Sequence, residues 1–132
     1  MNTEYSEQVE MDWDSISSAN IDLGERMLQE GLSVTYDEGG DTLLVTIGIG
    51  KSFEAVTEEL IDNIYIRILP DSLVIVGFVV LNFNTDFLAN NKLARKVLGD
   101  WFQELQSKGG VVNVEGNKAK MVESWLEAAM SR

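Results

Sequence analysis

The chain has no cysteine and no histidine among its 132 residues. Without cysteine there are no disulfides, thiolate metal sites or cysteine nucleophiles, as is typical of proteins from a reducing compartment. Without histidine there is no Ser-His-Asp triad, no histidine general base and no common zinc site. Any catalysis would have to depend on carboxylates, lysines or tyrosines. We therefore expect a protein that is not an enzyme and uses no cofactor.

Long apolar runs are also missing. None reaches the roughly 20 residues that a membrane-spanning helix needs, and the N-terminus lacks the basic and apolar regions of a signal peptide. We expect a cytoplasmic protein without membrane contact. With 45% hydrophobic residues, the chain is long enough to bury the core of one domain.

Basic residues are scarce, and 10 lysines and arginines against 22 carboxylates give a net charge of -12. Residues 1–41 hold eleven carboxylates against Arg26 alone, a net charge of -10, whereas residues 82–132 hold six carboxylates against seven bases, a net charge of +1. Such a field repels phosphates and anionic membranes, so we expect no direct nucleic-acid binding. It favours either simple solvation or a basic protein partner.

The acidity begins in residues 1–19, whose few apolar positions predict a flexible arm. Trp13 and Ile16 lie three residues apart, and this pair either folds back on the core, which we favour, or inserts into a partner. In the second case Trp13 is the apolar anchor, and Asp12 and Asp14 are the flanking contacts for a basic surface.

Residues 20–132 are predicted to form a single α+β domain. Alternation of apolar and polar residues predicts an antiparallel hairpin or meander sheet within about residues 33–83. Apolar residues at helical spacing predict a short N-terminal helix at 20–30 and two C-terminal helices at 86–108 and 118–130, packed against this sheet. Asn20 is the expected N-cap of the first helix and Gly31 the residue just past its end. Residues 51–60 fit either a helix or an irregular edge strand.

The segment 73–83 is apolar on both faces and so must be covered twice. One predicted face carries Leu73, Ile75, Val79, Leu81 and Phe83, and the other carries Val74, Val76, Phe78 and Val80. The C-terminal helix is one expected cover, and the N-terminal helix or a second copy of the chain is the other. The second alternative predicts a homodimer.

The predicted helix at 86–108 has an apolar stripe of Leu93, Val97, Trp101 and Leu105. Phe102 lies beside this stripe and is the expected exposed contact for a partner. The basic side chains of Lys92, Arg95 and Lys96 are interpreted as the solvated face of the helix, with the acidic arm as an alternative occupant.

Three patterns contain residue types that could support chemistry. The run Gly48-Ile49-Gly50-Lys51-Ser52 ends like a phosphate-binding loop, but the required earlier glycine is Val45, so the motif fails. Asp37 and Asp41 could hold a divalent metal ion, although hydrogen bonds to turn amides explain them more simply. Glu58 and Glu59 are adjacent, and neighbouring side chains diverge on a strand or a helix, which disfavours a hydrolase built on this pair.

The central segment, about residues 33–82, resembles the small prokaryotic family called domain of unknown function 2283. The resemblance rests on Tyr36, Asp37, Asp41 and the apolar run that follows, and on Gly77 before an apolar strand. This chain has Val79 where the family usually has a glutamate, and Pro70-Asp71-Ser72 at its last turn. The resemblance implies a small antiparallel sheet with a helix, self-association, and for some members a role as neutralising partners of toxin-like neighbours.

The sequence therefore predicts a non-enzymatic protein-binding or regulatory module, a neutralising partner of a basic protein. The alternative is a domain that binds a small ligand or a divalent metal through turn carboxylates, and a carboxylate-dependent hydrolase is a distant third.

Overall fold

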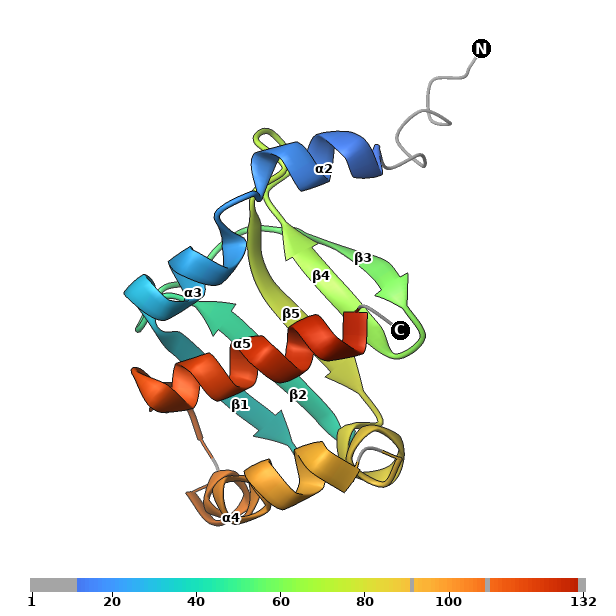
Figure 1. The fold of residues 1–132 in the computed structure, drawn as a ribbon, viewed down its shortest axis with the longest axis vertical. Coiled ribbons are helices and arrows are strands. Elements are labelled where there is room, and N and C mark those ends of the chain that lie inside the picture. The colour runs from blue at the N-terminus through green and yellow to red at the C-terminus, as the bar shows by residue number, and fades with distance from the viewer. Residues whose placement is uncertain (1–11, 91, 109, 131–132) are drawn as a thin grey trace.

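The chain folds into one six-stranded antiparallel sheet with helices, an α+β fold, in a computed structural model that describes residues 12–90, 92–108 and 110–130 (Figure 1). The strand order is β3-β4-β5-β2-β1-β6. The strands are β1 (Leu32–Asp37), β2 (Thr42–Ile47), β3 (Val56–Ile61), β4 (Ile64–Ile68), β5 (Ile75–Leu81) and β6 (Val112–Val114). The helices are α2 (Trp13–Ala19), α3 (Leu23–Glu30), the π-helix η1 (Phe83–Leu88), α4 (Lys92–Lys108) and α5 (Asn117–Met130).

The topology joins a hairpin, β1–β2, to a meander, β3–β4–β5. Because β5 pairs with β2, residues 48–55 must carry the chain from the end of β2 across to the far edge of the sheet. Two tight turns depend on left-handed backbone, at Asp41 (φ 50°) and Asn63 (φ 69°). Aspartate and asparagine tolerate this conformation better than most residues.

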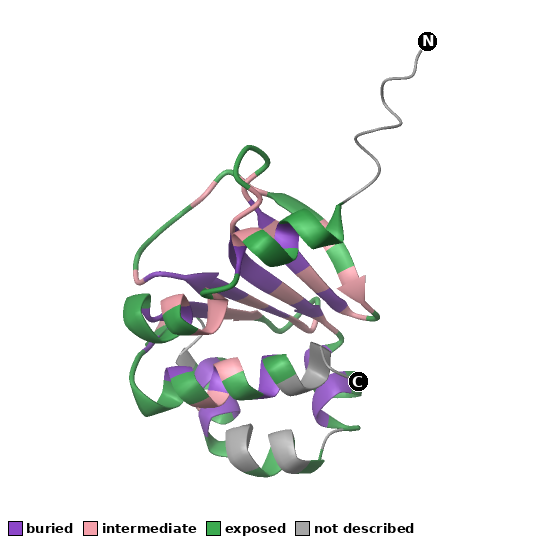
Figure 2. Cartoon of the chain, turned by 45° about the horizontal axis from the view of Figure 1, so that its top comes forward, coloured by how far each residue is buried: buried purple, intermediate pink, exposed green. Residues whose placement is uncertain are grey.

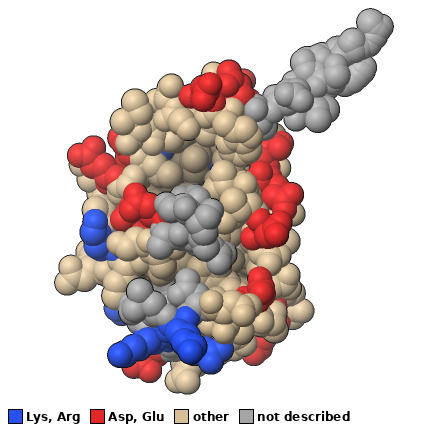
Figure 3. Space-filling model, turned by 45° about the vertical axis from the view of Figure 1, so that its right-hand side comes forward, with Lys and Arg blue, Asp and Glu red and all other residues tan. Residues whose placement is uncertain are grey.

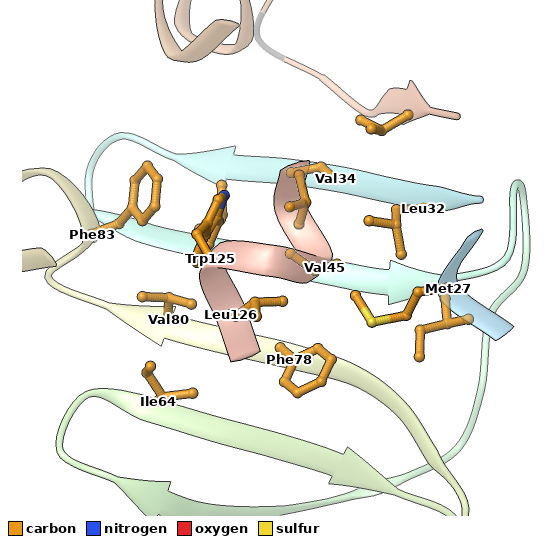
Figure 4. Close-up of a cluster of buried hydrophobic side chains, with 14 of the residues drawn as sticks. Met27, Leu32, Val34, Val45, Ile64, Phe78, Val80, Phe83, Trp125 and Leu126 are labelled. Atoms are coloured by element: carbon orange, nitrogen blue, oxygen red, sulfur yellow. The ribbon is translucent and has the colours of Figure 1, made fainter. Parts of the chain in front are cut away.

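The hydrophobic core lies between one face of the sheet and the helices. Side chains from the sheet, such as Val45, Phe78 and Val80, meet Met27 of α3 and Leu126 of α5 (Figure 4). Along β4, and from Thr42 to Val45 of β2, buried positions alternate with less buried ones (Figure 2), as expected when one face of a sheet is packed and the other is not.

The second face of β5 differs from the predicted one. Pairing between β4 and β5 shifts register between Arg67 and Ile68, which leaves Val76 as an extra residue in β5. The bulge reverses the alternation, so Ile75 shares the core face with Phe78 and Val80. The predicted grouping of Ile75 with Val79 and Leu81 was wrong, because a two-residue period cannot reveal an inserted residue.

No helix within the described residues supplies the expected second cover. Residues 48–55 instead cross the opposite face of the sheet, where Ser33 Oγ donates to the Gly48 carbonyl and accepts from the Gly50 amide, both at 3.1 Å. Further along, Arg67 donates to the Phe53 carbonyl at 3.1 Å. The rest of this face, which we call the open face, has a half-buried centre of Thr35, Leu44, Tyr65, Val79 and Leu81, bordered at the edge strand by the exposed Glu59.

The N-terminal helical region also differs from expectation. The predicted helix at 20–30 begins at Leu23, and Gly31 follows its last residue as predicted. Within the predicted arm, α2 is a helix whose Ile16 is 3% exposed in the core, so the fold-back alternative describes this part. The prediction of a flexible arm for residues 1–11 lies outside the described residues.

The later elements agree more closely. The ambiguous segment 51–60 contains the edge strand β3 and no helix. The predicted helix at 86–108 is divided into η1 and α4, and α5 matches the predicted helix at 118–130 within a residue. The side chains of Leu93 and Val97 lie outside the described residues. In the described part of the chain, no helix combines the length and apolar character needed to cross a membrane.

Candidate functional site

The three candidate partner-binding residues at the N-terminus lie together at the start of α2. Asp12 is the N-cap, and its carboxylate accepts from the amides of Asp14 (3.2 Å) and Ser15 (3.3 Å) and from Ser15 Oγ (2.7 Å). These hydrogen bonds, chiefly that of the Ser15 hydroxyl, hold the pKa of Asp12 below its ordinary value. Asp14 is exposed, and Trp13 is 42% exposed.

Asn20 holds α2 in place. It is only 8% exposed, and its side-chain amide donates to the carbonyls of Ile16 (2.7 Å) and Leu73 (2.9 Å). Its side-chain oxygen accepts from the Ile75 amide (2.7 Å) and from Arg26 (2.8 Å). The side chain expected to cap α3 therefore joins α2 to the start of β5, a role for which the sequence carries no signal.

Beneath Trp13 lies an apolar pocket of about 330 Å³. Its lining combines Trp13 and Ile16 of α2 with Leu60 of β3, Ile66 of β4 and Ile75 of β5. A volume near the lower end of the range for small-ligand sites suits one large apolar side chain. The sequence predicted Trp13 as an anchor but not the pocket, because Leu60 and Ile66 reach it only through the fold.

The edge strand β3 borders this pocket and is acidic. Glu58 lies opposite Ile66 and Glu59 opposite Tyr65, so the two carboxylates point to opposite faces of the sheet, as the sequence predicts for neighbours. Val56 of the same strand is 41% exposed. Residues 54–62 contain four carboxylates and no base.

Asp41 lies at the other end of the sheet and is fully hydrogen bonded. One carboxylate oxygen accepts from Tyr36 Oη (2.7 Å) and the Asn84 amide (2.8 Å), and the other from the Thr85 amide (3.0 Å) and Thr85 Oγ1 (2.8 Å). Burial opposes ionisation of Asp41, but these donors outweigh it and hold its pKa below the ordinary value. Burial and the neighbouring Asp41 carboxylate raise the pKa of Tyr36.

The hydrogen bonds of Asp41 disfavour the predicted metal site at Asp37 and Asp41. The four donors occupy the lone pairs that a cation would use, and Asp37 is exposed. Among the described residues, no group of three or more acidic, histidine or cysteine side chains could hold a metal ion. Asp41 therefore acts as a hydrogen-bond acceptor that fastens η1 to the β1–β2 turn.

Phe102 is not an exposed contact. It is 6% exposed, and its ring lies 4.9 Å from that of Tyr36 and 5.2 Å from that of Phe83, both edge-on. The prediction was wrong because α4 buries a face wider than one helical stripe where it meets the aromatic rings at the end of β1. Phe102 is a core residue.

Basic side chains are concentrated at one end of the molecule (Figure 3). Lys92, Arg95 and Lys96 of α4 are exposed, as predicted, and basic side chains gather at the lower end of the molecule, where α4 lies (Figure 3). Acidic side chains lie at the upper end and along both sides of the same view, and a few lie beside the basic group at the lower end. The α2 and β3 region therefore presents carboxylates with an apolar pocket, well away from the basic residues of α4.

Comparison of the chain with protein-family models, curated proteins and solved structures found no match. The resemblance to domain of unknown function 2283 therefore stays a prediction.

Proposed function

We propose that this protein is a non-enzymatic binding module that recognises a basic protein partner. The observation that carries the proposal is Trp13, half-exposed above an apolar pocket and flanked by the carboxylates of Asp12 and Asp14. Large aromatic side chains beside pockets dominate interface energetics, and surface carboxylates speed the encounter with a cationic partner. Such binding would regulate or neutralise that partner.

The fold supports this use of Trp13. Asn20 and the buried Ile16 fix α2 on the sheet, so Trp13 is held in position before a partner arrives. A contact that is preorganised loses less conformational entropy on binding.

A displayed library of random peptides, selected on the full-length protein, tests the proposal. We expect recovered peptides to be enriched in lysine or arginine together with a large apolar residue, and to bind the Trp13→Ala variant at least about tenfold more weakly. Titration calorimetry measures the affinities. Val111→Ala is the matched control, since Val111 is 65% exposed and lies outside this surface.

Recovered peptides without basic enrichment, or with equal affinity for the Trp13→Ala variant, would contradict the proposal. Circular dichroism separates loss of binding from loss of folding in that variant.

We further infer that two copies of the chain associate through the open face. The central positions of this face, Leu44, Val79, Leu81 and Tyr65, include no carboxylate. Two copies that each carry a charge of -12 repel most strongly where carboxylates meet, so the uncharged centre of this face, with Glu59 only at its β3 edge, is the favourable place for contact. The second cover predicted for β5 would then come from the partner copy.

Light scattering on the purified protein tests this assembly. We expect a dimer mass for the wild type and a monomer mass for Val79→Glu, which places a charge in the centre of the contact. Val111→Glu adds the same charge elsewhere and should leave the dimer intact. A wild-type monomer would refute the assembly without affecting the proposal for α2.

A further inference from the structure

We propose that the free edge of β3 receives an extended, basic segment of the partner as an additional strand of the sheet. This inference rests on the proposed function, because it assigns a place and a conformation to the basic partner. It goes further in that the main chain of β3, and not only the side chains near α2, becomes part of the binding site.

One edge of β3 has no neighbouring strand among the described residues. β3 is six residues long and pairs with β4 on one side, and no strand within the described residues lies on its other side. An edge strand presents a row of backbone donors and acceptors that an extended chain can pair with. The opposite edge, β6, has only three residues and offers a much shorter template.

The edge strand β3 is negatively charged on both faces of the sheet. Because Glu58 and Glu59 point to opposite faces, a strand added beside β3 would meet a carboxylate on each side of the sheet. Opposite charges across neighbouring strands stabilise the pairing and like charges destabilise it. We therefore expect the added strand to carry one basic side chain opposite Glu58 on one face of the sheet and another opposite Glu59 on the other face.

An apolar surface lies beside these carboxylates. Val56 is 41% exposed and shares the helix-covered side of the sheet with Glu58, as its pairing with Ile68 shows. Leu60 of the same strand lines the pocket beneath Trp13. Apolar residues of the added strand opposite Val56 and Leu60 would lie against this surface, so the edge and the pocket form one continuous site.

The same charges argue against a second copy at this edge. Antiparallel pairing of two β3 strands about their centre would place Glu58 of one copy opposite Glu59 of the other. This repulsion disfavours self-pairing, whereas a basic strand replaces it with attraction. The predicted order opposite β3, read along the added strand, is apolar, basic, basic, small polar, apolar.

A synthetic peptide with the sequence valine, lysine, lysine, threonine, valine between glycine spacers tests the inference on the full-length protein. In an NMR titration we expect the largest amide shifts in β3, and slower hydrogen exchange of its edge amides. A peptide N-methylated at alternate residues keeps its charge but loses hydrogen bonds on one edge. When the methyl groups face β3, affinity should fall by about tenfold.

Two variants locate the charge contribution. Glu58→Gln combined with Glu59→Gln should weaken binding by about fivefold. Glu25→Gln combined with Glu115→Gln changes net charge equally at exposed positions away from β3 and should leave the affinity unchanged. Shifts confined to β3 with these differences support the added strand.

Other outcomes overturn it in distinguishable ways. Equal affinity of the methylated and unmethylated peptides would overturn the added strand. Amide shifts scattered over the surface, with the same loss of affinity in both double variants, would also overturn it. Either result would leave general recognition of basic partners standing. No binding of this peptide, while library-selected peptides still require Trp13, would also overturn only the added strand. Failure of both experiments would overturn the proposed function as well.

Discussion

Asp41 combines a left-handed backbone with the most heavily hydrogen-bonded carboxylate described in this protein. Its neighbours in space come from β1, through Tyr36, and from η1, through Asn84 and Thr85. The sequence predicted hydrogen bonds from amides of its own turn, but the observed amide donors, Asn84 and Thr85, are 43 and 44 residues away. Only the return of β5 beside β2 brings them together, which is why a local pattern could not reveal them.

Replacement Asp41→Asn should destabilise the fold by about 2 kcal/mol, because hydrogen bonds to a charged group are each worth about 1.5–3 kcal/mol. Asparagine tolerates the backbone at φ 50°, so the loss reports the carboxylate and not backbone strain. Urea denaturation at neutral pH measures it. A loss below about 0.5 kcal/mol would contradict the assigned role.

The pH dependence gives an independent check of Asp41. Because its folded pKa lies below the ordinary value, its contribution is fully present above about pH 4 and is lost as pH falls through the folded pKa. The stability difference between wild type and Asp41→Asn should therefore shrink below about pH 4. A difference that stayed constant down to pH near 2 would contradict this linkage.

Asn20 is the second residue whose role is determined by tertiary contacts. Asn20→Ala leaves the buried Ile75 amide without its acceptor and two carbonyls without their donor, for an expected cost of about 3 kcal/mol. Ser18→Ala removes an exposed polar side chain of the same helix and should cost little. Thermal melts of both variants measure the difference, and equal losses would contradict the assigned hydrogen bonds.

At the scale of elements, the periodicity of apolar residues predicted the helices and the hairpin that depend only on neighbouring residues in the sequence. The α5 helix follows a regular apolar spacing, and β1 and β2 flank a turn rich in glycine and aspartate, so all three could be predicted from the sequence. The bulge in β5 and the pairing of β6 with β1 could not, since each depends on which strand lies alongside. For the candidate site, the sequence alone singles out Trp13, whereas the pocket that it lines exists only with α2, β3 and β4 in place.

The pairing of β5 with β2 predicts that Gly77 cannot be replaced. A Cβ at Gly77 would lie 2.6 Å from the Val45 carbonyl oxygen, so Gly77→Ala must push the two central strands apart. We expect a loss of about 1–3 kcal/mol, as for other overpacked sites. Gly110→Ala is the matched control, since no heavy atom lies within 4 Å of its added Cβ. Equal stability of both variants in urea would contradict the packing argument.

At the scale of the whole molecule, the excess of carboxylates weakens the fold that carries the proposed site. A net charge of -12 repels itself in the compact state, and salt screens this repulsion. The described ion pairs, such as Lys51 with Glu30 at 3.6 Å, oppose this repulsion only weakly, because each has at least one exposed partner and exposed pairs contribute little.

We therefore expect the melting temperature to rise as ionic strength increases from about 0.01 M to about 0.15 M, over which the Debye length falls from about 30 Å to about 8 Å. The affinity for a basic peptide should fall over the same range, because the carboxylates that repel one another in the free protein are those that attract the peptide. Differential scanning calorimetry and titration calorimetry in the same buffers measure the two trends. If both quantities moved in the same direction, a shared electrostatic origin of folding cost and binding would be excluded.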